Sequence, residues 1–501
     1  MARNRNAFLV AAGIGISRLA GLARDRVFSA YFGLEMEAGA WGAAFRIPNF
    51  IQNLFGEGVL SASFIPVYAR LLAEKDEEAA GRVAGAIGAL LALVVSVLVL
   101  AGVAAPAFFT DLIAPGFTGA ARDLTVRLVR ILFIGSGLLT LSAWCLGILN
   151  SHRKFFLSYT APVAWNAAMI ATMYWFGYQE RGSLVLTLAW GSVAGSALMF
   201  LVQLPAVLRY APRIRLGWSA HAREVTRNFG PVFVSRGVAQ ISGFIDVMLA
   251  TWLGPTAAAG LTRAQTLYML PVSLFGMSVS AAELPEMSAA PGDHGYLNQR
   301  LNAGLRQIAF FIVPSAMAFF ALGDVVTSAL FVTGRFRPED ARYVWAIIAG
   351  SAVGLLAQTL GRLYSSTYYA LRDTRTPLRY AIVRMILTTV LGIVFAFPMG
   401  LGVPGLTASA GIAGWVEFTL LRRSLNQRIG ATGVPAGLVA RLWGAALAGA
   451  ATAWGVKSVL GLERPIVNAA AILGTYGIVY FGVTFALGVD ECRRLVRRAI
   501  P

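Results

Sequence analysis

The chain has 501 residues, of which 57% are hydrophobic and 13% are charged, and its formal net charge is +18. Water-soluble domains carry about 25% charged residues, so half that fraction leaves too few polar groups to cover a water-exposed surface. Apolar runs recur from end to end, and each is long enough to cross about 30 Å of hydrocarbon. The composition therefore excludes a soluble protein and predicts an all-α polytopic membrane protein.

The high positive charge does not indicate a nucleic-acid partner. Nucleic-acid-binding proteins gather Lys and Arg in one basic patch or stripe, whereas here they lie mostly in alternate loops between apolar segments. That alternation is typical of the positive-inside rule. The two cysteines, Cys145 and Cys492, lie far apart, and the three histidines lie in separate loops. The sequence therefore predicts neither a disulfide framework nor a metal site.

The apolar runs and the loop residues that separate them predict about fourteen transmembrane helices. The first contains Arg18, Arg24, Asp25 and Arg26 and lacks a small-residue cleavage site, so we expect a retained span and not a cleaved signal peptide. In chain order, the predicted spans lie near 7–33, 38–70, 83–110, 123–149, 157–178, 184–208, 226–253, 259–283, 301–332, 340–370, 376–398, 402–424, 436–459 and 465–489.

Loop charge predicts how these spans are oriented. Arginines are concentrated in the loop 209–227, between the sixth and seventh spans, and in the tail 493–498. The loop after the first span carries Glu35 and Glu37 instead, and the loop after the seventh is uncharged. Positively charged loops stay in the cytoplasm. Since the number of spans is even, we expect both termini there.

Two stretches of the chain resemble each other at a steady separation. Asp25-x7-Gly33 recurs as Asp246-x7-Gly254. At almost the same separation, Phe55-Gly56 recurs as Phe275-Gly276 and Pro66 recurs as Pro285. A steady offset over several motifs indicates an internal duplication of two six-span halves in the same orientation.

The duplication predicts three parts. Residues 1–215 form an N-terminal six-helix lobe, residues 216–430 form a second six-helix lobe, and residues 431–501 contain two extra transmembrane helices and a basic cytoplasmic tail. Parallel halves related by an axis along the membrane normal are a transporter design, with the substrate site between them.

Charged residues inside the predicted spans mark the candidate substrate site. A charge at the bilayer centre costs about 2.5–3.5 kcal/mol on insertion scales and normally lines a cavity or pairs internally. Cations are in excess here, and arginine favours phosphate or carboxylate because its fork donates two hydrogen bonds without titrating. For any single residue, the alternative is an internal ion pair or a side chain that reaches the interface. The binding candidates are Arg18, Arg24, Asp25, Arg46, Asn49, Glu57, Arg236, Arg263 and Arg384.

The sequence points to ion-coupled or potential-driven transport without a cofactor. It contains no Walker loop, no H-E-x-x-H motif and no Gly-rich dinucleotide loop, so we predict a transporter and not an enzyme. Asp246, in the middle of the seventh span, is the candidate site for a coupling Na⁺ or H⁺. The alternative for Asp246 is a salt bridge with an arginine on a neighbouring helix. The membrane potential would supply about 2.3 kcal/mol per charge per 100 mV.

Three motifs resemble the MurJ/MviN family of lipid II flippases. They are Ser17-Arg18-Leu19-x-Gly21-x-x-Arg24-Asp25, Ala44-Phe45-Arg46-Ile47-Pro48-Asn49 and Ala370-Leu371-x-Asp373-Thr374-Arg375-Thr376-Pro377. The resemblance covers essentially the whole chain. It implies the multidrug/oligosaccharidyl-lipid/polysaccharide exporter fold and the flipping of undecaprenyl-pyrophosphate-linked peptidoglycan precursor by alternating access, in a bacterial inner membrane. It also implies that Arg18 and Arg24, with Arg46, line the substrate cavity.

The chain also departs from the family pattern within the predicted cavity. Gly39 stands where the family usually has an acidic residue, and Thr388 stands where some members have an Asn linked to sodium binding; Asp246 matches the family's cation-site aspartate. The other departures are at Gln52-Asn53, Gln265-Thr266 and Met269.

Two alternatives to lipid II transport therefore stay open. One is an exporter of another polyprenyl-pyrophosphate-linked glycan, such as O-antigen or exopolysaccharide. The other is a non-transporting scaffold that binds cell-wall synthesis enzymes. In every case bilayer lipids surround the chain, and in the first two the partner is a lipid-linked pyrophosphate.

Overall fold

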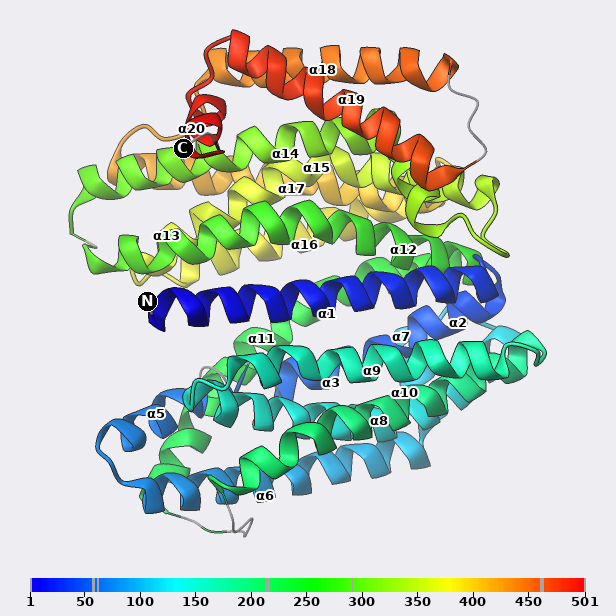
Figure 1. Cartoon of the computed structure of the whole chain (residues 1–501), viewed down its shortest axis with the longest axis vertical. Helices are drawn as coiled ribbons and strands as arrows, with labels where there is room; N and C mark the ends of the chain where they lie inside the picture. Colours follow the sequence, from blue (N-terminus) through cyan, green and yellow to red (C-terminus); the bar gives the residue numbers. More distant parts are fainter. Residues whose placement is uncertain are drawn as a thin grey trace. The chain divides into compact units, whose positions relative to one another are not determined.

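The computed structural model describes residues 2–55, 59–60, 63–211, 217, 219–290, 292–459 and 464–499, except for the side chains of residues 2–12, 14, 155, 231–232, 234–243 and 498–499. Within these ranges every regular element is a helix, and the one β-type pairing is an isolated bridge between Thr333 and Phe336. Figure 1 shows long helices running side by side within each part of the chain. The predicted all-α fold is confirmed.

Helices occupy all fourteen predicted spans. By length and composition, nine helical stretches of the described chain could cross a membrane. The second predicted span is divided into shorter helices, which include α2, α3 and α5 in the described part of the chain, and the eighth contains a π-helical segment that begins directly after Pro271. The helices are α1 (Ala2–Phe32), α2 (Met36–Ala44), α3 (Arg46–Phe55), α5 (Ile65–Ala73), α6 (Glu77–Ala104), α7 (Pro106–Ile113), α8 (Gly119–Ser151), α9 (Phe155–Phe176), α10 (Arg181–Leu208), α11 (Ala220–Trp252), α12 (Pro255–Pro271), η1 (Val272–Met277), α13 (Ser278–Ala289), α14 (His294–Phe331), α15 (Pro338–Ala370), α16 (Arg375–Ala396), α17 (Gly402–Ile429), α18 (Ala436–Val459), α19 (Pro465–Ala486) and α20 (Asp490–Ala499).

The chain divides into two compact units. Unit 1 comprises Met1–Ala259 with Thr333–Phe336, and unit 2 comprises Gly260–Val332 with Arg337–Pro501. This division groups α11 with unit 1, whereas the repeat places α11 at the start of the second lobe. The lobe boundaries at 215 and 430 follow the repeat and stay a prediction.

In unit 1, α8 is the central helix. It packs against α6 and α10, while α9 packs against α10 and α1. Trp144 of α8 is buried and donates a hydrogen bond from its indole to the carbonyl oxygen of Ala84 at 3.1 Å. Gly88 makes room for this indole, because a Cβ there would lie 2.7 Å from the ring. Close approach at small residues is the usual way in which membrane helices pack.

In unit 2, α15 has the central place. It packs against α14 and α17, and α17 also packs against α16. Gly354 and Gly411 let α15 and α17 approach closely, since a Cβ on Gly354 would lie 2.3 Å from the Gly411 Cα. α14 has non-helical backbone angles at Leu322. The indoles of Trp345 and Trp454 donate to the neighbouring carbonyls of residues 320 and 321 at 3.1 and 3.0 Å, which satisfies backbone groups at this kink.

Helix lengths repeat between the two halves of the sequence. α8 and α15 each have 33 residues, α9 and α16 each have 22, and α10 and α17 each have 28. The turns after α8 and α15 each place an arginine in the left-handed region, Arg153 and Arg372, both with φ of 58°. The turns after α1 and α11 use Gly33 and Gly254 in the same way, with φ of 55° and 105°. These matches support an internal duplication.

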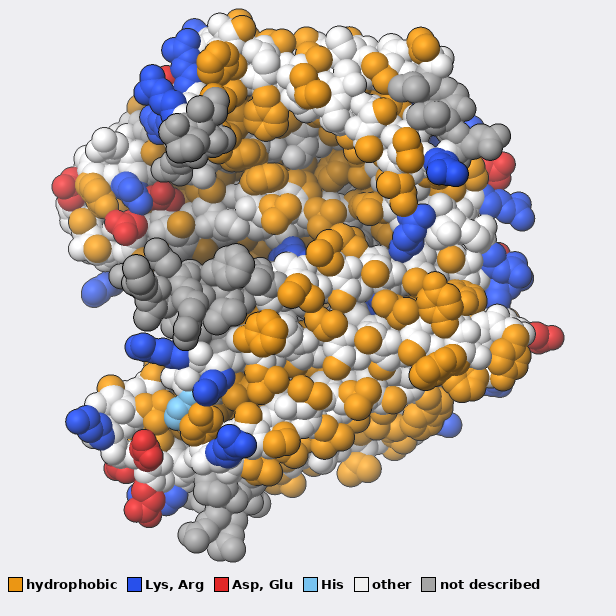
Figure 2. Space-filling view, viewed as in Figure 1, with side chains coloured by type: hydrophobic (Ala, Val, Ile, Leu, Met, Phe, Trp, Pro, Cys, Tyr) orange, Lys and Arg blue, Asp and Glu red, His pale blue; other side chains and the backbone are white. Residues whose placement is uncertain are grey.

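The surface of each unit suits a bilayer. In Figure 2, hydrophobic side chains cover the middle of α8, α9 and α10 in unit 1 and of α18 and α19 in unit 2, while charged side chains gather toward the helix ends. Large apolar side chains are exposed on these helices, among them Leu198, Leu201 and Ile478. An apolar middle with charged ends is the pattern that a hydrocarbon core selects.

Candidate functional site

The first-span motif builds an ion pair inside unit 1. The Arg24 guanidinium donates to Oδ1 of Asp25 through Nη2 at 2.9 Å and through Nε at 3.2 Å. Both side chains are largely buried, with 17% and 14% of their surface exposed. The guanidinium carbon also lies 5.3 Å from the centre of the Trp165 ring on α9, a cation–π distance. Asp25 therefore partly neutralises Arg24, and Trp165 holds its guanidinium in place.

An aromatic column supports this arginine. The rings of Trp41 and Phe45 stack with centroids 5.2 Å apart, and Phe45 stacks on Trp165 at 5.6 Å. The Trp165 indole donates to the backbone oxygen of Ser192 at 3.1 Å. Because the indole is fixed at one end and stacked on one face, the position of Arg24 depends on residues from α2, α9 and α10.

The second-span motif places Arg46 at a break in the helix. α2 ends at Ala44 and α3 begins at Arg46, so Phe45 separates the two helices. Arg46 interacts electrostatically with Asp246 of α11, and the rings of Phe50 and Phe244 meet edge to face at 5.2 Å. Asp246 is thus close enough to a neighbouring-helix arginine to act on it electrostatically, and the salt bridge considered as its alternative role stays a prediction. Asn49, one turn after Arg46, is exposed.

Arg18 lines a cavity of about 300 Å³ in unit 1 that has both polar and apolar residues in its lining. Gln52 of α3 lines the same cavity, as do the hydroxyl-bearing residues Ser142 of α8 and Ser158 of α9. Ser142 is held by a hydrogen bond from the Gln203 side chain. The Ser158 hydroxyl donates to the backbone oxygen of Lys154 at 3.3 Å, so the Arg18 guanidinium and the Gln52 amide are the donors that suit an anionic group. The substitution at position 52 thus supplies an uncharged donor beside Arg18.

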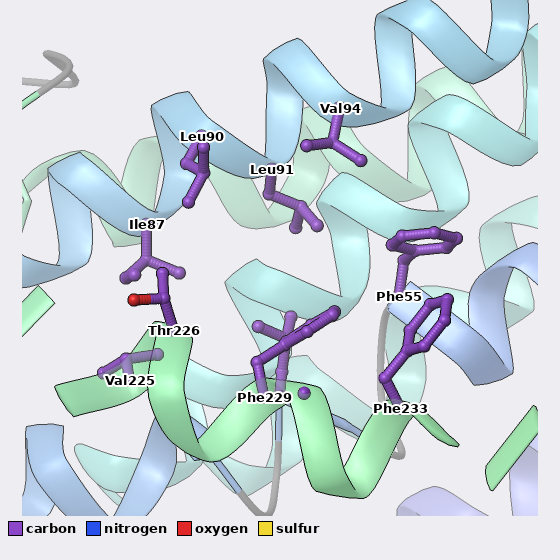
Figure 3. A pocket seen from close by; sticks show the side chains of 11 residues that line it. Phe55, Ile87, Leu90, Leu91, Val94, Val225, Thr226, Phe229 and Phe233 are labelled. Carbon is purple, nitrogen blue, oxygen red and sulfur yellow. The ribbon is translucent and has the colours of Figure 1, made fainter. Parts of the chain in front are cut away.

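A second cavity in unit 1 is lined mainly by apolar side chains. It measures about 320 Å³ and lies among α3, α6 and α11. Among the described residues that line it, only Thr226 has a polar side chain, and its hydroxyl donates to backbone oxygens of its own helix. The described lining therefore suits an apolar chain better than a pyrophosphate. Figure 3 shows the side chains of Phe55, Phe229 and Phe233 on one side and those of Ile87, Leu90, Leu91 and Val94 on the other.

Unit 2 contains a separate polar cluster around Arg384. The Nε of Arg384 on α16 lies 3.3 Å from a carboxylate oxygen of Glu417 on α17. Nearby, the Tyr268 hydroxyl donates to the Gln358 side chain at 2.8 Å, and Arg362 of α15 acts electrostatically on both Glu417 and Tyr268. Sequence reasoning found Arg384 but missed Arg362 and Glu417, although both are charges inside predicted spans and the same criterion would have found them.

Two further predicted residues, Arg263 and Thr388, lie in unit 2. Arg263 is buried in unit 2, with its guanidinium carbon 5.7 Å from the centre of the Phe331 ring. Thr388 is half-buried, and its backbone oxygen accepts a hydrogen bond from Ser409 at 3.3 Å. Glu57 and the side chain of Arg236 lie outside the described residues.

The motif Asp373-Thr374-Arg375-Thr376-Pro377 forms the turn between α15 and α16, which we call the Asp373 corner. Asp373 accepts hydrogen bonds from the backbone N–H groups of Arg375 and Thr376 at 3.1 and 3.0 Å and from the Thr376 hydroxyl at 2.7 Å. The Nη1 of Arg428 on α17 also forms an ion pair with Oδ2 of Asp373 at 2.8 Å. Burial by itself would raise the pKa of Asp373, but these hydrogen bonds and Arg428 lower it to about 2. The motif therefore has a structural role at the start of α16.

Position 39 has a steric explanation. A Cβ on Gly39 in α2 would lie 2.2 Å from the backbone oxygen of Pro255, at the start of α12. No side chain fits at that distance without a shift of the backbone. The acidic residue usual at this position in the family is thus excluded by the close approach of the two segments.

Comparison with known proteins gives concordant matches over nearly the whole chain. A family model described as lipid II flippase MurJ matches residues 28–464. The lipid II flippase MurJ of Burkholderia cenocepacia is 30% identical over 495 residues, which cover 94% of this chain and 95% of the relative. The probable lipid II flippase MurJ of Bdellovibrio bacteriovorus is 30% identical over 525 residues, which cover 99% and 97%.

Solved structures agree on the fold. A lipid II flippase MurJ in an inward closed conformation superposes with a TM-score of 0.81 at 23% identity, covering 96% of this chain and 99% of that chain. An inward-facing multidrug resistance transporter of the MATE family superposes with a TM-score of 0.70 at 20% identity, covering 82% and 94%. At these identities the likeness establishes the all-α fold.

Proposed function

The chain belongs to the lipid II flippase MurJ family, and from this membership we propose that it moves lipid II from the cytoplasmic to the periplasmic leaflet for cell wall synthesis. It is a multi-pass membrane transporter and not an enzyme. The family match over residues 28–464 is the observation that carries the proposal. The transport mechanism we propose is alternating access.

The arginines of unit 1 support an anionic substrate. Arg18 lines a cavity with hydroxyl and amide groups, and Arg24 is held in place by Asp25 and Trp165. Arg46 stands at a helix break that can present its guanidinium away from a regular helix face. Guanidinium groups bind phosphates with two parallel hydrogen bonds. We propose that Arg18 and Arg24, assisted by Arg46, hold the pyrophosphate of the substrate.

The test is complementation in a strain depleted of its own lipid II flippase. We expect the wild-type chain to restore growth and to restore exposure of labelled lipid II on the outer leaflet. Arg18→Ala and Arg24→Ala should each abolish both readouts, because a lost charged hydrogen bond costs about 1.5–3 kcal/mol and therefore reduces binding ten- to a hundredfold.

The matched control is Arg122→Ala. Arg122 is a more exposed arginine of unit 1 that pairs with Asp111 outside the cavity, so its loss should leave both readouts unchanged. Normal growth with correctly inserted Arg18→Ala and Arg24→Ala proteins would contradict the proposed binding site. Failure of the wild-type chain, together with rescue of a polysaccharide-export mutant, would select another polyprenyl-pyrophosphate glycan as substrate.

We also propose that the membrane potential, Na⁺ or H⁺ drives transport, with Asp246 as the coupling residue. Asp246 interacts with Arg46, so cation or proton binding at Asp246 would release a substrate-binding arginine. Asp246→Asn should make flipping independent of the ion that drives the wild-type protein. An unchanged ion dependence in this variant would refute the role of Asp246.

The proposed location is the bacterial inner membrane with both termini in the cytoplasm. The arginines of 209–227 and 493–498 support this orientation through the positive-inside rule. A reporter protein that is active only in the cytoplasm should be active when it is fused to either terminus. The protein partners we propose are cell-wall synthesis enzymes that consume the flipped precursor at the outer leaflet, which crosslinking in growing cells would test.

A further inference from the structure

A polar cavity of about 580 Å³ lies at one end of unit 2, far along the chain from the arginines of the first span. One wall is the face of α14 that carries Asn302, Arg306 and Phe310 at helical spacing. The other wall is α20, which contributes Glu491, Arg494 and Leu495. On the predicted orientation this end faces the cytoplasmic leaflet.

The α20 wall is fixed in place by its own residues. Gly488 has a φ of +69°, which turns the chain back after α19, as Figure 1 shows. Val489 and Cys492 are then buried, and the Cys492 thiol lies 3.5 Å from the backbone oxygen of Phe481. Because these buried residues fix α20 on its apolar side, the basic residues on its opposite side have defined positions at the cavity.

Several polar groups of the α14 wall already form hydrogen bonds or ion pairs within the protein. The Asn298 side chain donates to the backbone oxygens of Ile429 and Ala431 at 3.0 Å each. Asn302 accepts from the backbone N–H of Gly433 at 2.9 Å. These bonds tie the loop after α17 to α14 and make the wall rigid. Glu283, also at the cavity, lies 2.8 Å from Arg300 and is neutralised by it.

Two guanidinium groups stay available for a ligand. Arg306 is half-buried and Arg494 is exposed, and both line the cavity. Across the described residues, neither has a hydrogen-bonded or ion-paired side chain as partner. With Glu283 neutralised, these two arginines outnumber the remaining carboxylate of Glu491. The cavity is therefore suited to an anion with at least two acceptor oxygens.

Part of the cavity lining is apolar. It includes Phe310, Phe311 and Leu495, and the Phe311 ring stacks on Phe275 with centroids 4.5 Å apart. The centroid of the Phe310 ring also lies 5.8 Å from that of Tyr480 on α19. A ligand that contacts both the arginines and these apolar residues combines an anionic group with an apolar chain, as a phospholipid does.

We propose that this cavity binds an anionic phospholipid of the surrounding leaflet, with its phosphate between Arg306 and Arg494 and its first chain carbons against Phe310 and Phe311. The two guanidinium groups favour an anionic over a zwitterionic headgroup, because the ammonium of a zwitterionic headgroup would bring a like charge close to them. This site is separate from the proposed substrate site and does not depend on lipid II transport.

The test uses the purified full-length protein in detergent with phosphatidylglycerol or phosphatidylcholine added, and native mass spectrometry counts the retained lipids. We expect the wild type to retain phosphatidylglycerol preferentially. Arg306→Gln and Arg494→Gln should each weaken this retention about tenfold, the effect of one lost charged hydrogen bond. Arg306→Lys should retain part of it, and a normal size-exclusion profile would show that the variants are folded.

The matched control is Arg497→Gln, which removes the same charge from the same helix but does not line the cavity. We expect a change of less than about twofold, because an exposed charge beyond the site is screened by salt. Equal losses in all three glutamine variants would overturn the proposal and indicate general attraction of α20 to anionic surfaces. Displacement of the lipid by an equal concentration of free glycerophosphate would also overturn it, because the ligand would then be a soluble anion.

Discussion

Substitutions at Asp373 can separate how much its helix-capping hydrogen bonds and its ion pair with Arg428 each contribute to the free energy of unfolding. Its carboxylate accepts hydrogen bonds from two backbone N–H groups at the start of α16 and forms an ion pair with Arg428 at 2.8 Å. Asp373→Ala removes both interactions. Asp373→Asn keeps an acceptor oxygen for the backbone and removes only the charge, because Asn is about as good as Asp at a helix N-terminus.

The two variants should therefore differ in stability. Loss of an N-terminal cap costs about 1 kcal/mol. The ion pair is worth less than about 1 kcal/mol, since 43% of the Arg428 side chain is exposed. We expect Asp373→Ala to lower the free energy of unfolding by about 1.5–2 kcal/mol and Asp373→Asn to lower it by about 0.5 kcal/mol.

The pH dependence has a definite sign. The pKa of Asp373 is lowered from 3.8 to about 2, so burial is outweighed by the hydrogen bonds of Thr376 and by Arg428. A carboxylate with a lowered pKa stabilises the fold fully above its ordinary pKa, and this contribution is lost as the pH falls through the folded-state value. The difference between wild type and Asp373→Asn should thus be constant above about pH 4 and shrink toward pH 2.

The assay is reversible unfolding in mixed detergent micelles, with a double-mutant cycle for Asp373→Asn and Arg428→Gln. Asp293→Asn is the matched control, because Asp293 caps α14 through the Tyr296 N–H at 2.8 Å and, among the described residues, has no ion pair. It should change stability by less than about 0.3 kcal/mol. A loss for Asp373→Asn as large as for Asp373→Ala, or a coupling energy near zero with Arg428→Gln, would refute this account.

Two further predictions concern other polar contacts. The Nε2 of His152, just beyond α8, lies 2.9 Å from the Tyr68 hydroxyl, and burial lowers the pKa of His152 below 6.5. The free energy of unfolding should therefore be constant above about pH 6.5 and should fall as the pH drops below it. His152→Gln should remove this pH dependence of thermal unfolding. Lys457 donates to Asp324 at 2.6 Å, so Lys457→Met alone should lower the free energy of unfolding by about 2 kcal/mol, whereas adding Asp324→Asn should restore at least half. A double variant as unstable as Lys457→Met would contradict this.

Much of the fold could be predicted from the sequence because a bilayer imposes strong local rules. Each span needs about 20 apolar residues, and its backbone must bond within its own helix. Apolar length therefore located helices at all fourteen predicted spans. The matching lengths of α8 and α15 agree with the steady separation of the repeated motifs. Charge within a span also marked Arg24, Arg46 and Arg384, since such charges require a partner or a cavity.

Several partners of those charges could not be predicted, because they come from helices distant in sequence. Asp25 is the neighbour of Arg24 in the chain, but Trp165 beside Arg24, Asp246 near Arg46 and Glu417 beside Arg384 all lie on other helices. Likewise, the hydrogen bonds from Arg375 and Thr376 to Asp373 are local, but its ion pair with Arg428 forms only because α17 packs beside this turn. Apolar length and helical hydrogen bonding act within one segment, and so the sequence by itself determined the class, the spans and the excess of cations. Tertiary packing decided which arginines are paired, why position 39 is glycine, and where α20 and α14 enclose a polar cavity, because these depend on contacts between segments that no local pattern specifies.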